Sequence, residues 1–385
     1  MNRDFHYDVI SILAQTAGFP TNEATLIATA SQYTDDCTFY EKIPMNLNLP
    51  GQPGPDARYL QWETDLGQAF PQAQFTSFRN YAFEQDFQHF DPICTAHFNL
   101  EKRLKSLLGS PVALFRELSR LKNDRAMLKV FVAFHFVPDY DNAAPREKFH
   151  VEKNCRFLRD YMQALLGMLG TQPAGSLQRR QVLIALGIAL HSFADTWSHA
   201  GFSGRWNSQE NDIEDLKVAR QYGDQEKGIM PDIGHMEAGS WVDRPESDLA
   251  FSFEHTIGQR KSPVRRQNPV HFTQAAEEIF QILSGGSPFP SALKKFLFDA
   301  FRMDLEESER ITWLEHRVNV VRHLYDSYPN LQVHPYDRQQ WLNEIIPAPA
   351  DYNNRITYQY KPDADWFLFQ TAAMAQRNMI HAFVL

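Results

Sequence analysis

The chain has 385 residues, of which 43% are hydrophobic and 13% aromatic, enough to bury a large core in one or two domains. Its formal net charge of −9 and the lack of a long Lys/Arg run argue against a nucleic-acid-binding protein. Three cysteines, Cys37, Cys94 and Cys155, are far apart in the sequence and indicate buried thiols in a reducing compartment, not a disulfide framework.

The N-terminal part of the chain predicts a helical hairpin. Residues 4–18 carry apolar side chains at helical spacing, and Asn22 can cap a second helix over residues 23–36. Because the connection between them is short, the start of the first helix is expected to lie beside the end of the second. This arrangement would gather four polar side chains: Asp4, His6, Asp35 and Asp36.

The middle of the chain alternates between predicted loops and helices. Residues 41–100 are rich in Pro, Gly and aromatic side chains and predict long loops with a short strand or two; residues 205–270 predict mostly loop. Residues 156–170 and 179–202 predict helices, whereas the apolar run 126–137 fits either a strand or a helix end. Both loop regions are too long to be simple connectors, so we expect them to carry function.

The last part of the chain predicts four more helices. They cover residues 272–283, 290–303, 309–326 and 365–383. The whole pattern indicates a mainly α fold, in which residues 1–345 form one large helical domain and residues 346–385 a C-terminal loop and helix packed on it. No apolar run approaches the roughly 18 residues of a membrane-spanning helix.

Three potential metal ligands lie on one stripe of a predicted helix. In the stretch LHSFADTWSHAGFSG, residues 190–204, His191, Asp195 and His199 are four residues apart. Each step turns an α-helix by about 400°, so the side chains drift only about 80° around its axis and can converge on one ion. Zinc accepts both imidazole and carboxylate ligands. The alternative is a buried helix whose histidines find hydrogen-bond partners, but burying three such groups beside the run VLIALGIAL demands compensation.

Other segments supply further ligand candidates. His6 lies near Asp35 and Asp36 in the expected hairpin. His135 lies where an apolar run breaks into a turn, and His235 lies in a loop bounded by Gly and Pro. Each histidine taken alone also fits a surface or capping role. Together with the helix stripe, these residues have the number and kind of a cluster of two or three zinc ions.

The order and spacing of these residues resemble those of a known superfamily. His6, Tyr-Thr-Asp at 33–35, HFVPD at 135–139 and H-x3-D-x3-H at 191–199 are similar to motifs of the zinc-dependent phospholipase C and P1-type nuclease superfamily. The longer pattern DFHYDV…ASQYTDD…HSFADTWSHAGFSG…DIGH looks like a bacterial and fungal family of zinc metallophospholipases C. These motifs lie within residues 1–245.

The resemblance implies a mostly helical zinc-hydrolase domain of this type, with long functional loops and a three-zinc site. By position, it implies that His6 is the early histidine ligand and that Asp35, or its neighbour Asp36, is the bridging carboxylate. It also implies three further ligands: His135, His191 and Asp195.

The sequence departs from the superfamily pattern at three places. His199 follows the stripe's aspartate earlier than the corresponding superfamily ligand does. No acidic residue stands four positions after His235, so Glu237 or Asp243 would have to substitute. The chain begins with Met where superfamily enzymes expose a processed N-terminal Trp that binds zinc, and Asp4 is a candidate for that role.

Such a site suits hydrolysis of a phosphodiester. Zinc lowers the pKa of bound water, binds phosphoryl oxygens and stabilises charge on the leaving oxygen. Asp35 or Asp36 is the candidate catalytic residue that orients the water and accepts its proton. The carboxylates expected to hold the metal-bound histidines in place are Asp139, Asp232 and Asp243.

The resemblance implies a phospholipase C that cuts phosphatidylcholine-like glycerophospholipids at a membrane surface, giving diacylglycerol and a phosphorylated headgroup. The aromatic-rich stretch 70–91 is either a lipid-contacting surface or part of the core. A P1-type nuclease would prefer a basic groove, which the net charge of −9 disfavours. Another phosphoesterase, or a zinc-binding protein without catalysis, remains an alternative.

The N-terminal segment MNRDFHYDVI lacks the basic and apolar regions of a secretory signal peptide. We therefore expect the protein to be cytoplasmic, or exported into a host cell by a secretion system that reads no such signal. A phospholipase C in its own cytoplasm would threaten its own membrane, which favours export.

Overall fold

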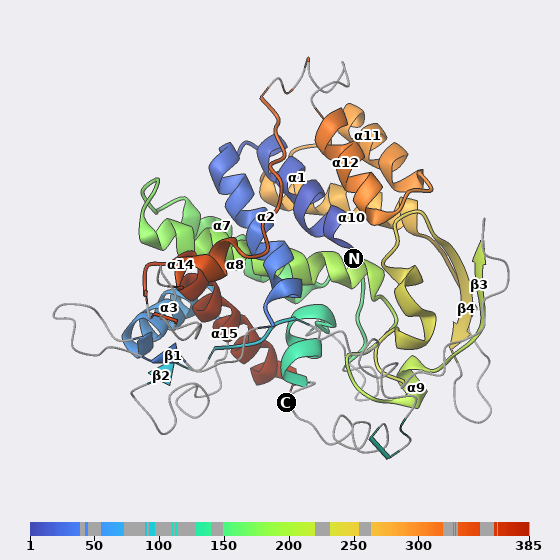
Figure 1. Cartoon of the computed structure of the whole chain (residues 1–385), viewed down its shortest axis with the longest axis horizontal. Helices are drawn as coiled ribbons and strands as arrows, with labels where there is room; N and C mark the ends of the chain where they lie inside the picture. The colour runs from blue at the N-terminus through green and yellow to red at the C-terminus, as the bar shows by residue number, and fades with distance from the viewer. Residues whose placement is uncertain are drawn as a thin grey trace.

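In the computed structural model, helix α8 (Leu177–Ser198) runs through the middle of the molecule, with other helices packed around it (Figure 1). The side chain of Ser176 caps its start by accepting a hydrogen bond from the Arg179 amide at 3.1 Å. From Gln181 to Ser198 every residue of α8 is buried. A helix that is buried on all sides needs no single apolar face, because it packs on several neighbours at once. These neighbours are α2 (Thr21–Asp36), α7 (Arg156–Leu169), α10 (Asn268–Leu283) and α15 (Asp365–Val384).

The structure describes these residues: 1–38, 43–44, 55–72, 89–90, 92–96, 110, 112–113, 128–139, 149–219, 232–253, 263–318, 326, 328, 330–346, 358–359 and 361–384. Within these segments, no helix is long and apolar enough to cross a membrane.

Helices α2 and α8 pack unusually closely at Gly187. A Cβ atom placed on this residue would lie 2.3 Å from the Ile27 carbonyl oxygen and 2.6 Å from the Ala30 Cβ. Only glycine avoids these clashes, so the contact between the two helices depends on this position.

The N-terminal segment forms the expected hairpin. A π-helical segment, η1 (Asp4–Val9), continues into α1 (Ile10–Thr16), and α2 returns alongside both. All six residues of η1 are buried. The start of the first helical segment therefore lies beside the end of α2, as the short connection predicted.

Further helices complete the body. Helices α10, α11 (Ser291–Arg302) and α12 (Glu307–Arg317) pack beside the N-terminal hairpin, with α11 and α12 at the upper right in Figure 1. On the other side, α15 packs on α8 and on η3 (Leu128–His135), so the C-terminal helix lies on the same body as the rest. The remaining helices named here are α3 (Pro55–Ala69), α9 (Ser208–Asn211), η4 (Met236–Val242) and α14 (Gln340–Glu344).

The region predicted as mostly loop, residues 205–270, contains a three-stranded antiparallel sheet. Its order is β3 (Ile213–Ala219), β4 (Asp248–Phe253) and β5 (Pro263–Gln267). The register of β3 against β4 shifts between Glu214 and Lys217, so the alternation of buried and exposed residues is interrupted there. That irregularity hid the strand pattern in the sequence.

The region 41–100 contains the short strands that were predicted and one helix that was not, α3. Besides α3, a two-stranded ribbon pairs β1 (Ile43–Pro44) with β2 (His89–Phe90). At the two ends of the aromatic-rich stretch, Phe70 and Phe90 are buried in the main core. The proposed lipid-contacting residues between them, at 73–88, lie outside the described residues.

Candidate metal centre

The last two turns of α8 and the residue that follows them carry the stripe predicted from the sequence. His191, Asp195 and His199 are all buried, with 3% or less of each residue exposed. His199 follows the last helical residue, and its amide still donates to the Asp195 carbonyl at 2.8 Å. The three side chains therefore share one end of the helix, although His199 lies just beyond it.

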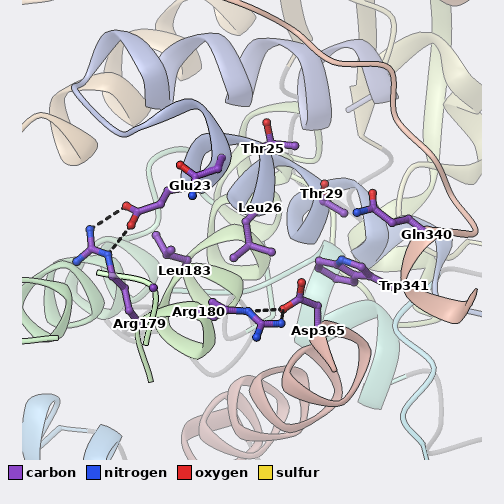
Figure 2. Close-up of a pocket in the computed structure, with 12 residues that line it drawn as sticks. Glu23, Thr25, Leu26, Thr29, Arg179, Arg180, Leu183, Gln340, Trp341 and Asp365 are labelled. Atoms are coloured by element: carbon purple, nitrogen blue, oxygen red, sulfur yellow. Dashed lines mark hydrogen bonds and ion pairs between the residues drawn. The ribbon is translucent and has the colours of Figure 1, made fainter. Parts of the chain in front are cut away.

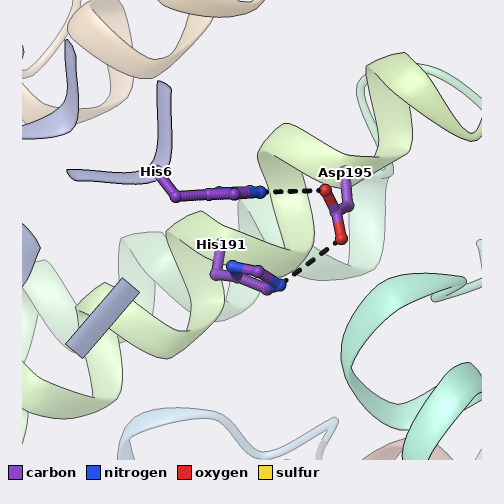
Figure 3. A group of neighbouring side chains, drawn as sticks. All are labelled: His6, His191 and Asp195. Atoms are coloured by element: carbon purple, nitrogen blue, oxygen red, sulfur yellow. Dashed lines mark hydrogen bonds and ion pairs between the residues drawn. The ribbon is translucent and has the colours of Figure 1, made fainter. Parts of the chain in front are cut away.

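The first ligand group consists of His6, His191 and Asp195 (Figure 3). The Nε2 atom of His6 lies 3.1 Å from one Asp195 oxygen, and Nε2 of His191 lies 3.4 Å from the other. The two imidazole rings stack with their centroids 4.0 Å apart. One ligand atom from each residue lies within 4.8 Å of the others, which is close enough to bind one ion.

The second group consists of Asp35, His135 and His191. An oxygen of Asp35 lies 3.7 Å from Nδ1 of His135 and 3.7 Å from Nε2 of His191. Nδ1 of His135 also lies 3.2 Å from Asp195. The first two groups are therefore contiguous, since His191 belongs to both and Asp195 contacts histidines of both.

The third group consists of His199, His235 and Asp243. The two Asp243 oxygens lie 3.2 Å from Nε2 of His199 and 3.3 Å from Nε2 of His235. His235 and Asp243 flank the 3-10 helix η4, in which Gly239 has φ 59° and redirects the chain. This turn brings an acidic side chain back to the histidine eight positions before it in the sequence.

The Met1 amine lies between the groups. It is 2.5 Å from an Asp195 oxygen and 3.1 Å from an Asp243 oxygen. Burial alone lowers the pKa of this amine, but the nearby carboxylates of Asp195 and Asp243 outweigh that effect and raise it to about 11. An ammonium group thus supplies positive charge where the carboxylates of the first and third groups approach each other.

Backbone carbonyls orient three of the histidines. Nε2 of His135 donates to the Thr95 oxygen at 3.0 Å, and Nδ1 of His199 donates to the His135 oxygen at 2.6 Å. Nδ1 of His235 donates to the Gly239 oxygen at 3.0 Å. In each case the proton is fixed on the outer nitrogen, and the nitrogen that faces the ligand group keeps its lone pair.

The protonation states favour cation binding. Burial, the neighbouring His191 and the Met1 amine hold the pKa of His6 well below its usual value. Burial works against ionisation of Asp195, but the Met1 amine and three imidazoles hold its pKa well below the usual range. Desolvation, opposed by His135 and assisted by Asp195, raises the pKa of Asp35 to about 7. His6 is therefore a neutral imidazole and Asp195 an ionised carboxylate, the forms that bind a metal ion, whereas Asp35 exchanges its proton near neutral pH.

Two π-helical segments carry candidate metal ligands. His6 lies in η1, and His135 ends η3, where the Phe136 amide donates to the Phe131 oxygen at 2.7 Å. A π-helical turn is rare and less favourable than an α-helical one, and such turns occur often at functional sites. The apolar run 126–137, which sequence periodicity could not assign, contains this second segment.

Two other candidate ligands lie elsewhere. Asp4 forms an ion pair with Arg310 at 3.1 Å and is a member of none of the ligand groups. Asp36 forms an ion pair with Arg338 at 3.2 Å, so Asp35 is the member of the pair that faces the histidines. The structure places the Met1 amine, and not Asp4, beside the first group.

The three carboxylates expected to support the histidines have different surroundings. Asp139 accepts the Arg156 amide at 2.6 Å at the start of α7. Asp232 and Glu237 lie together in a separate acidic group with Asp212. The third, Asp243, is itself a member of a ligand group. Its sequence signal was weak because no helical spacing links it to His235.

A cavity of about 270 Å³ lies at the opposite end of the α2–α8 pair (Figure 2). Two ion pairs line it: Glu23 with Arg179, and Arg180 with Asp365. Trp341 contributes an aromatic wall. Every charge named here has an opposite partner, in contrast to the ligand groups.

The donor set fits zinc. All its ligand atoms are imidazole nitrogens or carboxylate oxygens. Nδ1 of His6 and Nδ1 of His191 are buried without a partner, so neither ring is held by hydrogen bonds on both sides.

In comparisons with known proteins, a model described as a family of unknown function, DUF6765, matches residues 1–384. No curated protein and no solved structure matches the sequence.

Proposed function

We propose that these groups form a zinc-dependent phosphodiesterase site of the phospholipase C type. The chain belongs to the DUF6765 family, whose function is unknown. One observation carries this proposal. Three His/Asp groups are contiguous through His191, Asp195 and the Met1 amine, which is a multinuclear arrangement and not a single closed structural site.

The site is open on one side. The Asp35 side chain is 31% exposed, whereas those of His6, His191 and Asp195 are at most 2% exposed. A substrate can therefore approach the groups past Asp35. A structural zinc site would be closed by four protein ligands, so this exposure supports a catalytic role.

The roles of the chain's residues follow from their positions. Zinc ions held by these groups would supply Lewis-acid polarisation of phosphoryl oxygens and would acidify the attacking water. Asp35 is the accessible carboxylate, and its position suits it to orient that water and accept its proton. The backbone carbonyls of Thr95, His135 and Gly239 keep the histidine rings in fixed orientations, so little reorganisation is needed during the reaction.

Glycerophospholipid is the preferred substrate in this proposal, and single-stranded nucleic acid the second candidate. The net charge of −9 supports lipid over polynucleotide, because polynucleotide binding depends mainly on cationic contacts to many phosphates. Cleavage on the glycerol side of the phosphate would release diacylglycerol and a phosphorylated headgroup.

The test begins with metal content. Purified, unchelated protein should contain two or three zinc ions per chain by plasma emission. The same protein should release diacylglycerol from mixed phospholipid vesicles, lose this activity on chelation and regain it with zinc. Degradation of single-stranded DNA without diacylglycerol release would favour the nuclease. Fully metallated protein that acts on neither substrate would mark a non-catalytic zinc protein.

A further inference from the structure

A basic cluster lies directly beside the third ligand group. It consists of Lys153, Trp197, Arg266 and His271. Arg266, on β5, is 3% exposed, and its guanidinium donates to the backbone oxygens of Trp197 at 3.1 Å and Ser198 at 2.5 Å. Nζ of Lys153 lies 3.0 Å from Nε2 of His271 and 5.8 Å from the centroid of the Trp197 ring. The four side chains therefore form one contiguous set.

The charge of this cluster has no acidic partner. Among the described residues, no carboxylate lies within ion-pair distance of Lys153 or Arg266. Burial lowers the pKa of Arg266 to about 10, and Asp243 is the carboxylate that opposes this effect. Asp243 already contacts two histidines and the Met1 amine. A buried guanidinium without a counter-charge is costly, and an arriving anion would relieve that cost.

The cluster also has hydrogen-bond donors without acceptors. An ammonium group has only donors, so Nε2 of His271 accepts from Lys153 and Nδ1 of His271 carries the proton. That Nδ1 atom, Nε1 of Trp197 and Nε of Arg266 are all buried without a partner. Three buried N–H groups in one cluster are unusual, because nearly all such groups in proteins are paired. A water molecule could accept from them, but it would not neutralise the two cations.

We propose that Lys153, Trp197, Arg266 and His271 form a binding site for a phosphate-type oxyanion, beside the metal centre and separate from its ligands. The ammonium of Lys153 and the imidazole of His271 lie at the surface side of the cluster, and Arg266 supplies charge beneath them. Trp197 stands between Asp195 and His199 in the sequence. Arg266 donates to the backbone oxygen of Ser198, the residue before His199, so the oxyanion binds beside the third ligand group.

This site specifies the substrate class, and the assignment rests on the proposed function. A phosphodiester bound at the metal groups with a second phosphate on its headgroup would place that phosphate near Lys153. A choline headgroup would instead bring a cation toward two cations. The preferred lipid therefore carries a phosphorylated headgroup, as phosphatidylinositol 4-phosphate does, and phosphatidylcholine is a poorer substrate.

The lipid experiment uses metal-loaded protein and vesicles that contain either phosphatidylinositol 4-phosphate or phosphatidylcholine. Lys153→Gln should lower kcat/KM on the phosphorylated lipid about tenfold, the usual effect of losing one charge-assisted hydrogen bond, and change the value for phosphatidylcholine less than about twofold. Lys153→Glu should reverse the preference between the two lipids. Lys295→Gln, which removes a lysine that is 69% exposed and paired with Asp299, is the matched control and should change neither value.

A second experiment uses inorganic phosphate alone, titrated calorimetrically into the same metal-loaded proteins. Lys153→Gln should weaken phosphate binding about tenfold relative to wild type, and Lys295→Gln should not. Equal cleavage of both lipids together with unchanged phosphate affinity in Lys153→Gln would overturn the oxyanion site and leave the proposed function standing. If wild type cuts no lipid, the proposed function fails, and the phosphate titration alone decides whether the oxyanion site exists.

Discussion

The two ends of the α2–α8 pair bury polar groups in opposite ways. At one end, Arg179 forms a bidentate ion pair with Glu23 at 2.6 and 2.8 Å, and Arg180 pairs with Asp365. At the other end, imidazoles and carboxylates face one another around Asp195 with the Met1 ammonium as the nearby cation. At the first end, each of these charged side chains has a partner of opposite charge. The second presents lone pairs that converge, an arrangement that is stable only when cations supply the missing charge.

The largest effect expected is that of a ligand at the second end. Asp195→Asn should lower phosphodiesterase activity by on the order of a thousandfold, because a neutral amide weakens the charge stabilisation that the metal ions depend on. Zinc content should fall in parallel. Asp36→Asn is the matched control, since Asp36 pairs with Arg338 and faces away from the groups. Full zinc content and wild-type activity in Asp195→Asn would show that both ends of the helix pair are merely structural.

The next effect concerns the ion pair that holds η1 in place. Arg310→Met should lower the free energy of unfolding by about 3–5 kcal/mol, because it leaves the fully buried Asp4 without its cation. Urea denaturation measures this change. Arg338→Met, at a side chain that is 55% exposed, should cost less than about 1 kcal/mol. Similar losses of unfolding free energy in the two variants would contradict the explanation that burial makes the Arg310 ion pair more important than the Arg338 ion pair.

A smaller effect is expected at the end of the α2–α8 pair where Arg179 forms its ion pair with Glu23. Arg179→Met should cost about 1–2 kcal/mol, since its ion pair is bidentate but only partly buried. Zinc content and activity should stay at wild-type levels, because this end lies several helical turns from the ligands. Thermal unfolding and plasma emission test both statements. A loss of zinc in Arg179→Met would mean that the two ends are coupled.

The smallest effect is a pH dependence beside the metal centre. Burial, Lys153 and Arg266 lower the pKa of His271 to about 3, whereas an unfolded chain would have about 6.5. Between these values the unfolded state binds the proton and the folded state does not, so stability falls as the pH drops from about 6.5 toward 3. His271→Gln should remove about 1 kcal/mol of this loss at pH 5, a value reduced for partial exposure. Urea midpoints at pH 5 and pH 8 give the comparison, and an unchanged pH slope would contradict it.

The ligands on α8 could be predicted because helical spacing is local. His191 and Asp195 share a face wherever the helix packs, so sequence positions alone placed them together. The choice between Asp35 and Asp36 could not be made in this way. Consecutive residues point about 100° apart, and the partner that draws Asp36 away, Arg338, comes from a distant part of the chain.

The third group was harder to predict because its parts meet through turns. Asp243 reaches His235 only because Gly239 adopts a positive φ within η4. The sheet beside it was missed because the shifted register in β3 separates Ile213, Leu216 and Val218 by unequal steps along the chain. The π-helical form of η3 also lay beyond sequence reasoning, since an apolar run that is buried on every side shows no period.

The glycine at the crossing of α2 and α8 has a consequence for which ions the site accepts. Gly187 lies one turn before His191, and its neighbours Ala30 and Ser31 lie about one turn before Asp35. The width of the gap between these two ligands is therefore set by the volume of a residue that offers no ligand atom. In the proposed zinc site, ionic radius would enter the selectivity through this contact, and a wider crossing would suit a larger divalent cation with the same donors in place.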